Sequence, residues 1–153
     1  MKTKQLSVFL ENKTGRINQV TRILGENGIN MLAFSIAETA DFGIIRMIVS
    51  DVDKASQVMK EAHFAVRVTD VVCIKCSNQA GSLSKILDVL ANANVFIEYM
   101  YAFLGGKAAA HATMIFHVQD ADAAVAALAE GDYAGAEAAF NSLHTYVTSK
   151  LSW

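Results

Sequence analysis

The chain contains the same structural element twice, at a constant offset along the sequence. The first copy opens with Asn12-Lys13-Thr14-Gly15 and the second with Asn78-Gln79-Ala80-Gly81. Apolar residues follow both openings at matching positions: Ile17, Val20 and Leu24 in the first copy, and Leu83, Ile86 and Leu90 in the second. Self-similarity at a fixed period indicates a repeat, so the chain is predicted to be two units of one design.

A length of 153 residues fits either one domain or two small ones, and the repeat favours two. We expect a first module at residues 1–70 and a second at residues 71–153 with an atypical C-terminal segment. The hydrophobic content of 53% is high for units so small that a single core is only marginally stabilising. Apolar surface should therefore also be buried between units, which favours a homodimer.

Composition excludes several classes of function. The net charge of -2 lacks the basic excess of a phosphate-binding surface, so no nucleic-acid partner is expected. No run approaches the roughly 20 apolar residues that cross a bilayer, and the amino terminus has no basic stretch followed by an apolar core. We expect a cytoplasmic protein with no membrane association. Two cysteines are too few for a disulfide framework, which fits a reducing compartment.

Alternating apolar residues predict a strand before each opening turn, and helical spacing predicts a helix after it. The strand residues are Leu6, Val8 and Leu10 in the first unit, and Val72, Ile74 and Cys76 in the second. The helices are expected to end near Gly28 and Asn94, residue types that tolerate a left-handed backbone.

The rest of each unit reads as a hairpin followed by a second helix. The hairpin strands are expected at 29–37 and 43–49, and at 95–104 and 111–118, with turn signals at 41–43 and 105–107. Helices at 52–62 and 121–129 follow Asp51 and Asp120, which are suited to cap them. A strand at 65–68 closes the first unit. The fold class is α+β: two ferredoxin-like βαββαβ modules, each an antiparallel sheet with both helices on one face.

The C-terminal segment departs from the repeat. The spacing of Ala136, Phe140, Leu143, Val147 and Leu151 favours a helix from about 134 to 143, whereas the strand formers at 144–149 favour a strand near 145–151. Both readings stay open, and the second unit is expected to be closed differently from the first.

The turn before each first helix is the best candidate binding site. A helix begins with unpaired backbone N–H groups and a partial positive charge, and a glycine there lets an anion approach the backbone. Asn12 and Asn78 offer amide donors and acceptors, and Arg16 adds a cation that Ser82 does not supply in the second copy. The alternative is that these residues only shape the turn and cap the helix.

The repeat resembles a tandem pair of ACT domains, the small-molecule-sensing modules attached to or partnered with enzymes of amino-acid metabolism. The resemblance lies in Glu11 to Ile17, Gly28-Ile29-Asn30, Asn78 to Leu83, and Phe96-Ile97-Glu98-Tyr99. In that family the turn usually reads Asn, any residue, Pro, Gly, any residue, Leu. This chain has Thr14 and Ala80 in place of the proline, which makes both loops less rigid.

Family members typically bind amino acids where two modules lie side by side. The resemblance therefore implies a set of ligand-contacting residues: Asn12, Thr14, Gly15, Arg16, Ile17 and Asn30, with Asn78, Ala80, Gly81, Ser82 and Leu83. It also implies modules that pair within the chain and between chains, a partner enzyme of amino-acid metabolism, and no cofactor.

Competing functions have weaker support. Cys73 and Cys76 form a lone C-x-x-C, but their odd spacing along a strand sends the two side chains to opposite faces, with Cys76 inward, so no metal site is expected. The strand at 43–49 lacks the aromatic residues of an RNA-recognition module. The histidines show no H-E-x-x-H spacing, and no G-x-S-x-G motif is present, so no catalytic residue is predicted.

One acidic residue has two open interpretations. Glu98 lies on an otherwise apolar strand, where it either neutralises a ligand ammonium across an interface or extends to water. The function that these patterns favour is a non-enzymatic regulatory protein that binds an amino acid and modulates an enzyme in trans. The alternative is a structural or protein-interaction module with a degenerate pocket, and a small enzyme ranks third.

Overall fold

The computed structural model describes residues 1–104, 110–136 and 140. Their elements, in chain order, are β1 (Lys2–Glu11), α1 (Arg16–Glu26), β2 (Met31–Glu38), β3 (Phe42–Val49), α2 (Val52–Glu61), β4 (Ala65–Ser77), α3 (Ser82–Asn92), β5 (Ile97–Leu104), β6 (His111–Val118) and α4 (Ala121–Glu130). They form two compact units. We call Lys4–Thr69 the first module, and Met1–Thr3 together with the described residues from Asp70 onward the second module.

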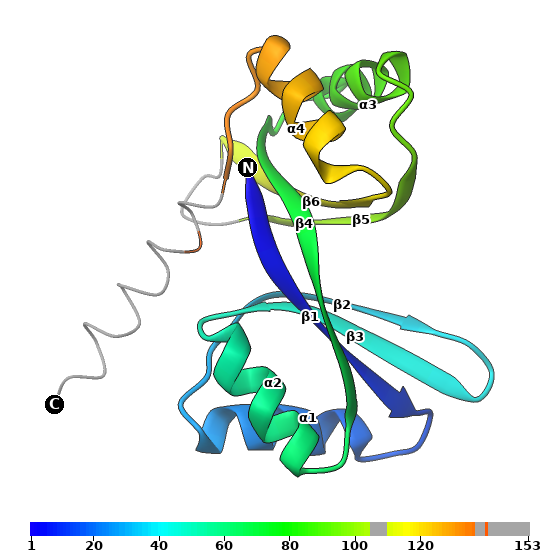
Figure 1. Ribbon diagram of the computed structural model, residues 1–153, viewed down its shortest axis with the longest axis vertical. Coiled ribbons are helices and arrows are strands. Elements are labelled where there is room, and N and C mark those ends of the chain that lie inside the picture. The colour runs from blue at the N-terminus through cyan, green and yellow to red at the C-terminus, as the bar shows by residue number, and fades with distance from the viewer. Residues whose placement is uncertain (105–109, 137–139, 141–153) are drawn as a thin grey trace, which may run out of the picture. The chain divides into compact units, whose positions relative to one another are not determined.

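The first module is built on four neighbouring strands of a six-stranded sheet, in the order β2-β3-β1-β4. β1 and β2 both pair antiparallel with β3, and the registers set Leu10 and Glu38 opposite Gly43. Helices α1 and α2 lie together on one face of this sheet (Figure 1). This is the α+β, ferredoxin-like arrangement predicted from the sequence.

The core of the first module comes from one face of the strands and one side of each helix. Alternate residues of a strand point to the same face, so every second residue of β1 and β3 faces the helices. The buried members of this core are Leu6, Val8, Leu10, Val20, Leu24, Ile29, Ile45, Met47, Val49, Ala55, Met59 and Phe64. The apolar spacing in the sequence predicted the members from β1 and α1 correctly, except that Ile17 is 42% exposed.

The second module repeats the design with the same registers. β4 and β5 both pair antiparallel with β6, which sets Cys76 and Leu104 opposite Ala112. Helices α3 and α4 lie together on one face (Figure 1). The buried core residues are Val72, Ile74, Cys76, Ile86, Leu90, Met114, Phe116, Val118, Ala124 and Leu128.

The second module takes its closing strand from the chain's amino terminus. The Cys73 amide donates to the carbonyl of Met1 at 2.6 Å, Met1 packs against the second core, and Lys2 forms an ion pair with Asp122 at 2.7 Å. Through its hydrogen bond and its charge, Asp122 raises the pKa of Lys2, and Lys2 lowers the pKa of Asp122. The start of β1 therefore belongs to the second module and the remainder to the first.

The helix predicted from about residue 134 does not begin there. Gly135 forms an antiparallel bridge with Ile74, the Lys75 amide donates to the Ala134 carbonyl at 2.9 Å, and the Ala136 amide donates to the Cys73 carbonyl at 3.0 Å. This extended segment pairs with β4, whose backbone groups need partners along that edge. Apart from Phe140, the predicted tail beyond residue 136 lies outside the described residues.

Two strands that the sequence suggested as separate are one continuous strand. Residues 65–68 and the run beginning at Val72 both belong to β4. Its burial changes from mostly exposed before Asp70 to buried from Val71 to Ile74. β4 therefore supplies the last strand of the first module and the first strand of the second.

The predicted inward direction of Cys76 is confirmed. Cys76 belongs to the second core beside Val72 and Ile74, while Cys73 has the opposite strand parity. Both cysteines are buried, and neither is in a disulfide. Among the residues that the structure describes, no group of three or more metal-ligating side chains comes together.

The predicted caps of α2 and α4 are confirmed. Asp51 Oδ1 accepts from the Lys54 amide at 3.0 Å, and Asp120 Oδ1 accepts from the Ala123 amide at 2.9 Å. Each aspartate thus satisfies an amide that the helix itself leaves unpaired.

We predict that Asp51→Ala and Asp120→Ala each lower the free energy of unfolding by about 1 kcal/mol, the usual contribution of a carboxylate N-cap. Urea unfolding followed by circular dichroism measures this loss. Asp53→Ala is the matched control, since Asp53 lies in the first turn of α2 without capping it. A loss in Asp53→Ala equal to that in Asp51→Ala would contradict the assignment of the cap.

Candidate functional site

The first turns of α1 and α3 differ from those of α2 and α4. Gly15 and Gly81 occupy the N-cap positions of α1 and α3, with φ of 90° and 83°, and no side chain caps either helix. Neither first turn contains an acidic residue. α2 and α4 have an aspartate cap and a further aspartate in the first turn. The Arg16 and Ser82 amides donate to the Lys13 and Gln79 carbonyls at 3.3 and 3.2 Å. The amides that follow them in each first turn have no aspartate cap, which suits an external anion.

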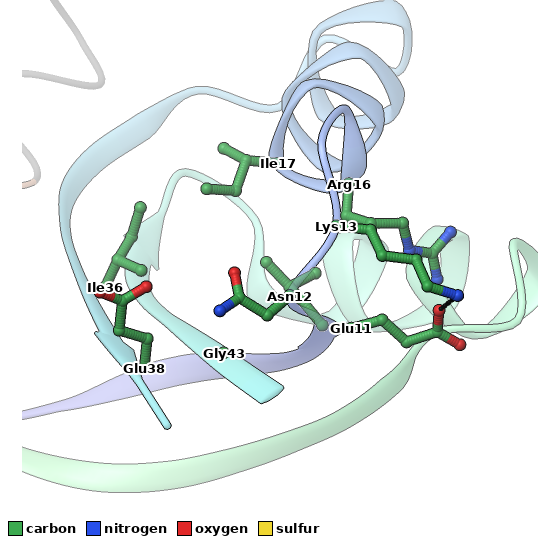
Figure 2. Close-up of a pocket in the computed structure, with 9 residues that line it drawn as sticks. Glu11, Asn12, Lys13, Arg16, Ile17, Ile36, Glu38 and Gly43 are labelled. Atoms are coloured by element: carbon green, nitrogen blue, oxygen red, sulfur yellow. Dashed lines mark ion pairs between the residues drawn. The ribbon is translucent and has the colours of Figure 1, made fainter. Parts of the chain in front are cut away.

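A pocket of about 50 Å³ lies beside the first turn of α1 (Figure 2). Its walls come from the end of β1 and the following loop, from α1, and from the hairpin strands β2 and β3. The lining residues are Leu10, Glu11, Asn12 and Lys13 from the first of these, Arg16 and Ile17 from α1, and Ile36, Glu38 and Gly43 from the hairpin. This volume accommodates only a few heavy atoms, which suits the charged groups of a small metabolite.

The hairpin register brings β2 to the pocket. Glu38 and Leu10 both pair with Gly43, so the end of β2 and the end of β1 flank one glycine of β3. Figure 2 shows the Asn12 side chain pointing toward Ile36 and Glu38. The site thus combines an amide, a carboxylate and an apolar wall within reach of the α1 amides.

The basic side chains of the pocket extend to its other side (Figure 2). Lys13 Nζ lies 2.7 Å from Glu11 Oε2, and this hydrogen bond and charge lower the pKa of Glu11, with a smaller contribution from Arg16. Arg16 Nη1 donates to Gln19 Oε1 at 2.7 Å, and its guanidinium carbon lies 4.5 Å from the centre of the Phe64 ring. Among the described residues, the shielded Nε of Arg16 has no hydrogen-bond partner.

The structure brings together three of the predicted residues of the first module. Asn12, Arg16 and Ile17 line the pocket, and Thr14 and Gly15 form the turn that leads into α1. Asn30 is not part of this pocket. It stands at the start of β2, where its amide donates to Ser50 Oγ at 2.9 Å, whereas Glu38 stands at the end of that strand.

The predicted residues of the second module form the equivalent turn. The Asn78 amide donates to the Ala110 carbonyl at 2.9 Å, as the Asn12 amide donates to that of Asp41 at 3.1 Å. Ala80 and Gly81 complete the turn, and Ser82 and Leu83 begin α3. Residues 105–109 lie outside the described residues.

Sequence reasoning missed the pocket residues contributed by the hairpin. Glu38, Ile36 and Gly43 are remote in sequence from the Asn12 turn and come to it through strand pairing. A signal for Glu38 was present, since it is the one charged residue of β2 and directly precedes the hairpin turn.

Glu98 contacts another residue of its own module. Its Oε2 atom lies 2.9 Å from His117 Nδ1, and the two side chains form an ion pair when His117 is protonated. The Tyr99 ring stacks on His117 with centroids 4.8 Å apart. Glu98 thus contacts its own module while its side chain stays 42% exposed, and both interpretations of it stay open.

Both the sequence and the fold are similar to those of known proteins. The family model described as an ACT domain pair matches residues 1–135. The chain belongs to this ACT family. Membership agrees with the paired βαββαβ modules, and it confirms the resemblance drawn from the two turns.

One relative of this ACT protein is the small subunit of an enzyme. It is 24% identical over 108 residues to an acetolactate synthase small subunit from Buchnera aphidicola, a match that covers 58% of this chain and 66% of that relative. The match thus spans slightly less than two thirds of the relative's length.

Two solved structures illustrate the fold of this ACT protein. Protein BT0572 from Bacteroides thetaiotaomicron is 47% identical with a TM-score of 0.82, and the match covers 87% of this chain and 90% of that one. The regulatory subunit of aspartate kinase from Thermus thermophilus is 14% identical with a TM-score of 0.58, over 84% and 92% of the two chains. At that identity the second match shows the fold alone. Within the described residues, no helix has the length and apolarity to span a membrane.

Proposed function

We propose that this ACT protein is a non-catalytic regulatory protein of the cytoplasm that binds an amino acid and modulates a metabolic enzyme in trans. One observation carries the proposal: the uncapped first turn of α1 opens beside a pocket that also holds Asn12 and Glu38. A zwitterion presents a carboxylate and an ammonium a short distance apart. The helix amides suit the first group, and a carboxylate side chain suits the second.

The edge position of β2 favours completion of the site by a neighbouring module. β2 is the outer strand of its sheet, and Phe34 and Ile36 on it are 59% and 45% exposed. An unpaired strand edge with apolar side chains is a surface on which another strand pairs readily. A homodimer joined at such edges would enclose the ligand between modules, as the resemblance to the ACT family implies.

Regulation follows if ligand occupancy changes the packing of the modules. A ligand shifts an equilibrium only by its difference in affinity for the two states, and such coupling typically amounts to about 1–3 kcal/mol. An enzyme of amino-acid metabolism that binds only one of those states would respond to the change in module packing. Its identity is a question for affinity capture from native lysate with and without the ligand.

We predict that at least one of the twenty amino acids stabilises the protein. A ligand at 100 times its dissociation constant adds about 2.7 kcal/mol to the free energy of unfolding, because it binds the folded state alone. A thermal-shift screen of the dimeric sample detects this. A sample that responds to none of the twenty would favour an interaction module with a degenerate pocket.

A further inference from the structure

The second module provides an internal comparison for the pocket. Each residue of the first module corresponds to a residue further along the chain in the second module. The difference in residue number is constant before the hairpin turn, as from Asn12 to Asn78, and slightly larger after it, as from Asp51 to Asp120. The four charged residues of the pocket, Glu11, Lys13, Arg16 and Glu38, correspond to Ser77, Gln79, Ser82 and Leu104. Every charge is therefore absent from the second copy.

The strand registers verify this correspondence. Glu38 pairs with Gly43, and Leu104 pairs with Ala112 at the same place in the second sheet. Leu104 is 63% exposed, so an uncharged side chain stands in the open where the first module has a carboxylate. The glycine of the first pocket is also replaced by Ala112, which adds a methyl group on that side.

Glu38 differs from the other acid of the pocket in its surroundings. Glu11 is paired with Lys13 at 2.7 Å. Across residues 1–104 and 110–136, no lysine or arginine forms an ion pair with Glu38, which is exposed. Its carboxylate is thus free to accept from a cationic group of a ligand, and charge-assisted hydrogen bonds of this kind are the strong ones.

We infer that Glu38 recognises the ammonium group of the ligand, and that each chain therefore binds one zwitterion, in the first module. The inference rests on the proposed function and adds the recognising residue and the stoichiometry. The second module keeps Asn78 and an α3 terminus without an aspartate cap, but Ser77 and Leu104 stand where the first module has Glu11 and Glu38. A zwitterion placed there would leave its positive charge unpaired, which is costly once water is excluded.

Isothermal titration calorimetry on the full chain tests this, with the twenty amino acids as probes and the N-acetyl derivative of the responding one as the uncharged comparison. The wild type should bind one molecule per chain. Glu38→Gln should weaken binding about tenfold or more, because it removes the charge and keeps the shape. N-acetylation should weaken binding to the wild type to a similar extent.

Leu104→Gln is the matched control in the second module and should bind as the wild type does. Circular dichroism and thermal midpoints verify that both variants fold, as expected for exposed positions. Two molecules per chain, or wild-type affinity in Glu38→Gln, would overturn the inference and leave the proposed function standing. A wild type that binds none of the twenty would refute the proposed function, and the inference with it.

Discussion

Replacing Phe116 with alanine is expected to lower the free energy of unfolding by about 3–5 kcal/mol. Phe116 has no exposed surface and is among the largest buried side chains of the second core. It pairs in register with Val72 on β4 and with Met100 on β5. Its removal therefore leaves a cavity between the middle of the sheet and the helices, where neighbouring side chains collapse only partly.

A loss of this size is a large part of the roughly 5–15 kcal/mol by which small domains are stable. Urea unfolding of Phe116→Ala and of the wild type measures it. Phe96→Ala is the matched control, because Phe96 belongs to the same module but is 61% exposed, and its loss should stay within about 0.5 kcal/mol. Equal losses in the two variants would mean that Phe116 is not in the core.

Much of the fold could be predicted from local patterns in the sequence. The alternation at Leu6, Val8 and Leu10 predicted which face of β1 is buried, and Asp51 and Asp120 marked the starts of α2 and α4. These features depend on neighbours in sequence, where propensity and periodicity operate. The repeat then supplied each prediction twice.

The strand that the two modules share could not be predicted from local patterns. The repeat boundary near residue 70 looks like the end of one strand and the start of another, whereas β4 runs unbroken from Ala65 to Ser77. Its second part pairs with the amino terminus at Met1 and with the bridge at Gly135. Both partners are distant from β4 along the chain, so no local spacing of residues predicts these pairings.

The candidate site, too, was predictable from the sequence only in part. The Asn12 turn and the α1 residues Arg16 and Ile17 came from a contiguous motif, whereas Glu38 reaches the pocket through pairing with β3. The direction of the Arg16 side chain also depends on tertiary structure. Its guanidinium stacks over Phe64, a residue that follows α2 and is remote from Arg16 in the sequence. A motif supplies candidate residues, and the packed structure decides where their side chains point.

The second large effect concerns the two turn glycines. Gly15→Val is expected to abolish amino-acid binding, while Gly81→Val leaves it unchanged. Both glycines have positive φ, at 90° and 83°, and in both an added Cβ meets no atom within 4 Å. A β-branched residue there is strained by its backbone and not by a collision, so both variants should lose a similar stability of about 1–3 kcal/mol.

Calorimetry with the responding amino acid separates the two effects, because stability falls in both variants and affinity in only one. At Gly15 the strain reshapes the turn that presents the α1 amides beside Asn12 and Glu38, and any relaxation toward negative φ redirects those amides away from the ligand carboxylate. At Gly81 the same strain acts on a turn whose module has Leu104 at the position of Glu38. Retained binding in Gly15→Val would move the ligand elsewhere, whereas loss in both variants would mean that the two turns bind together.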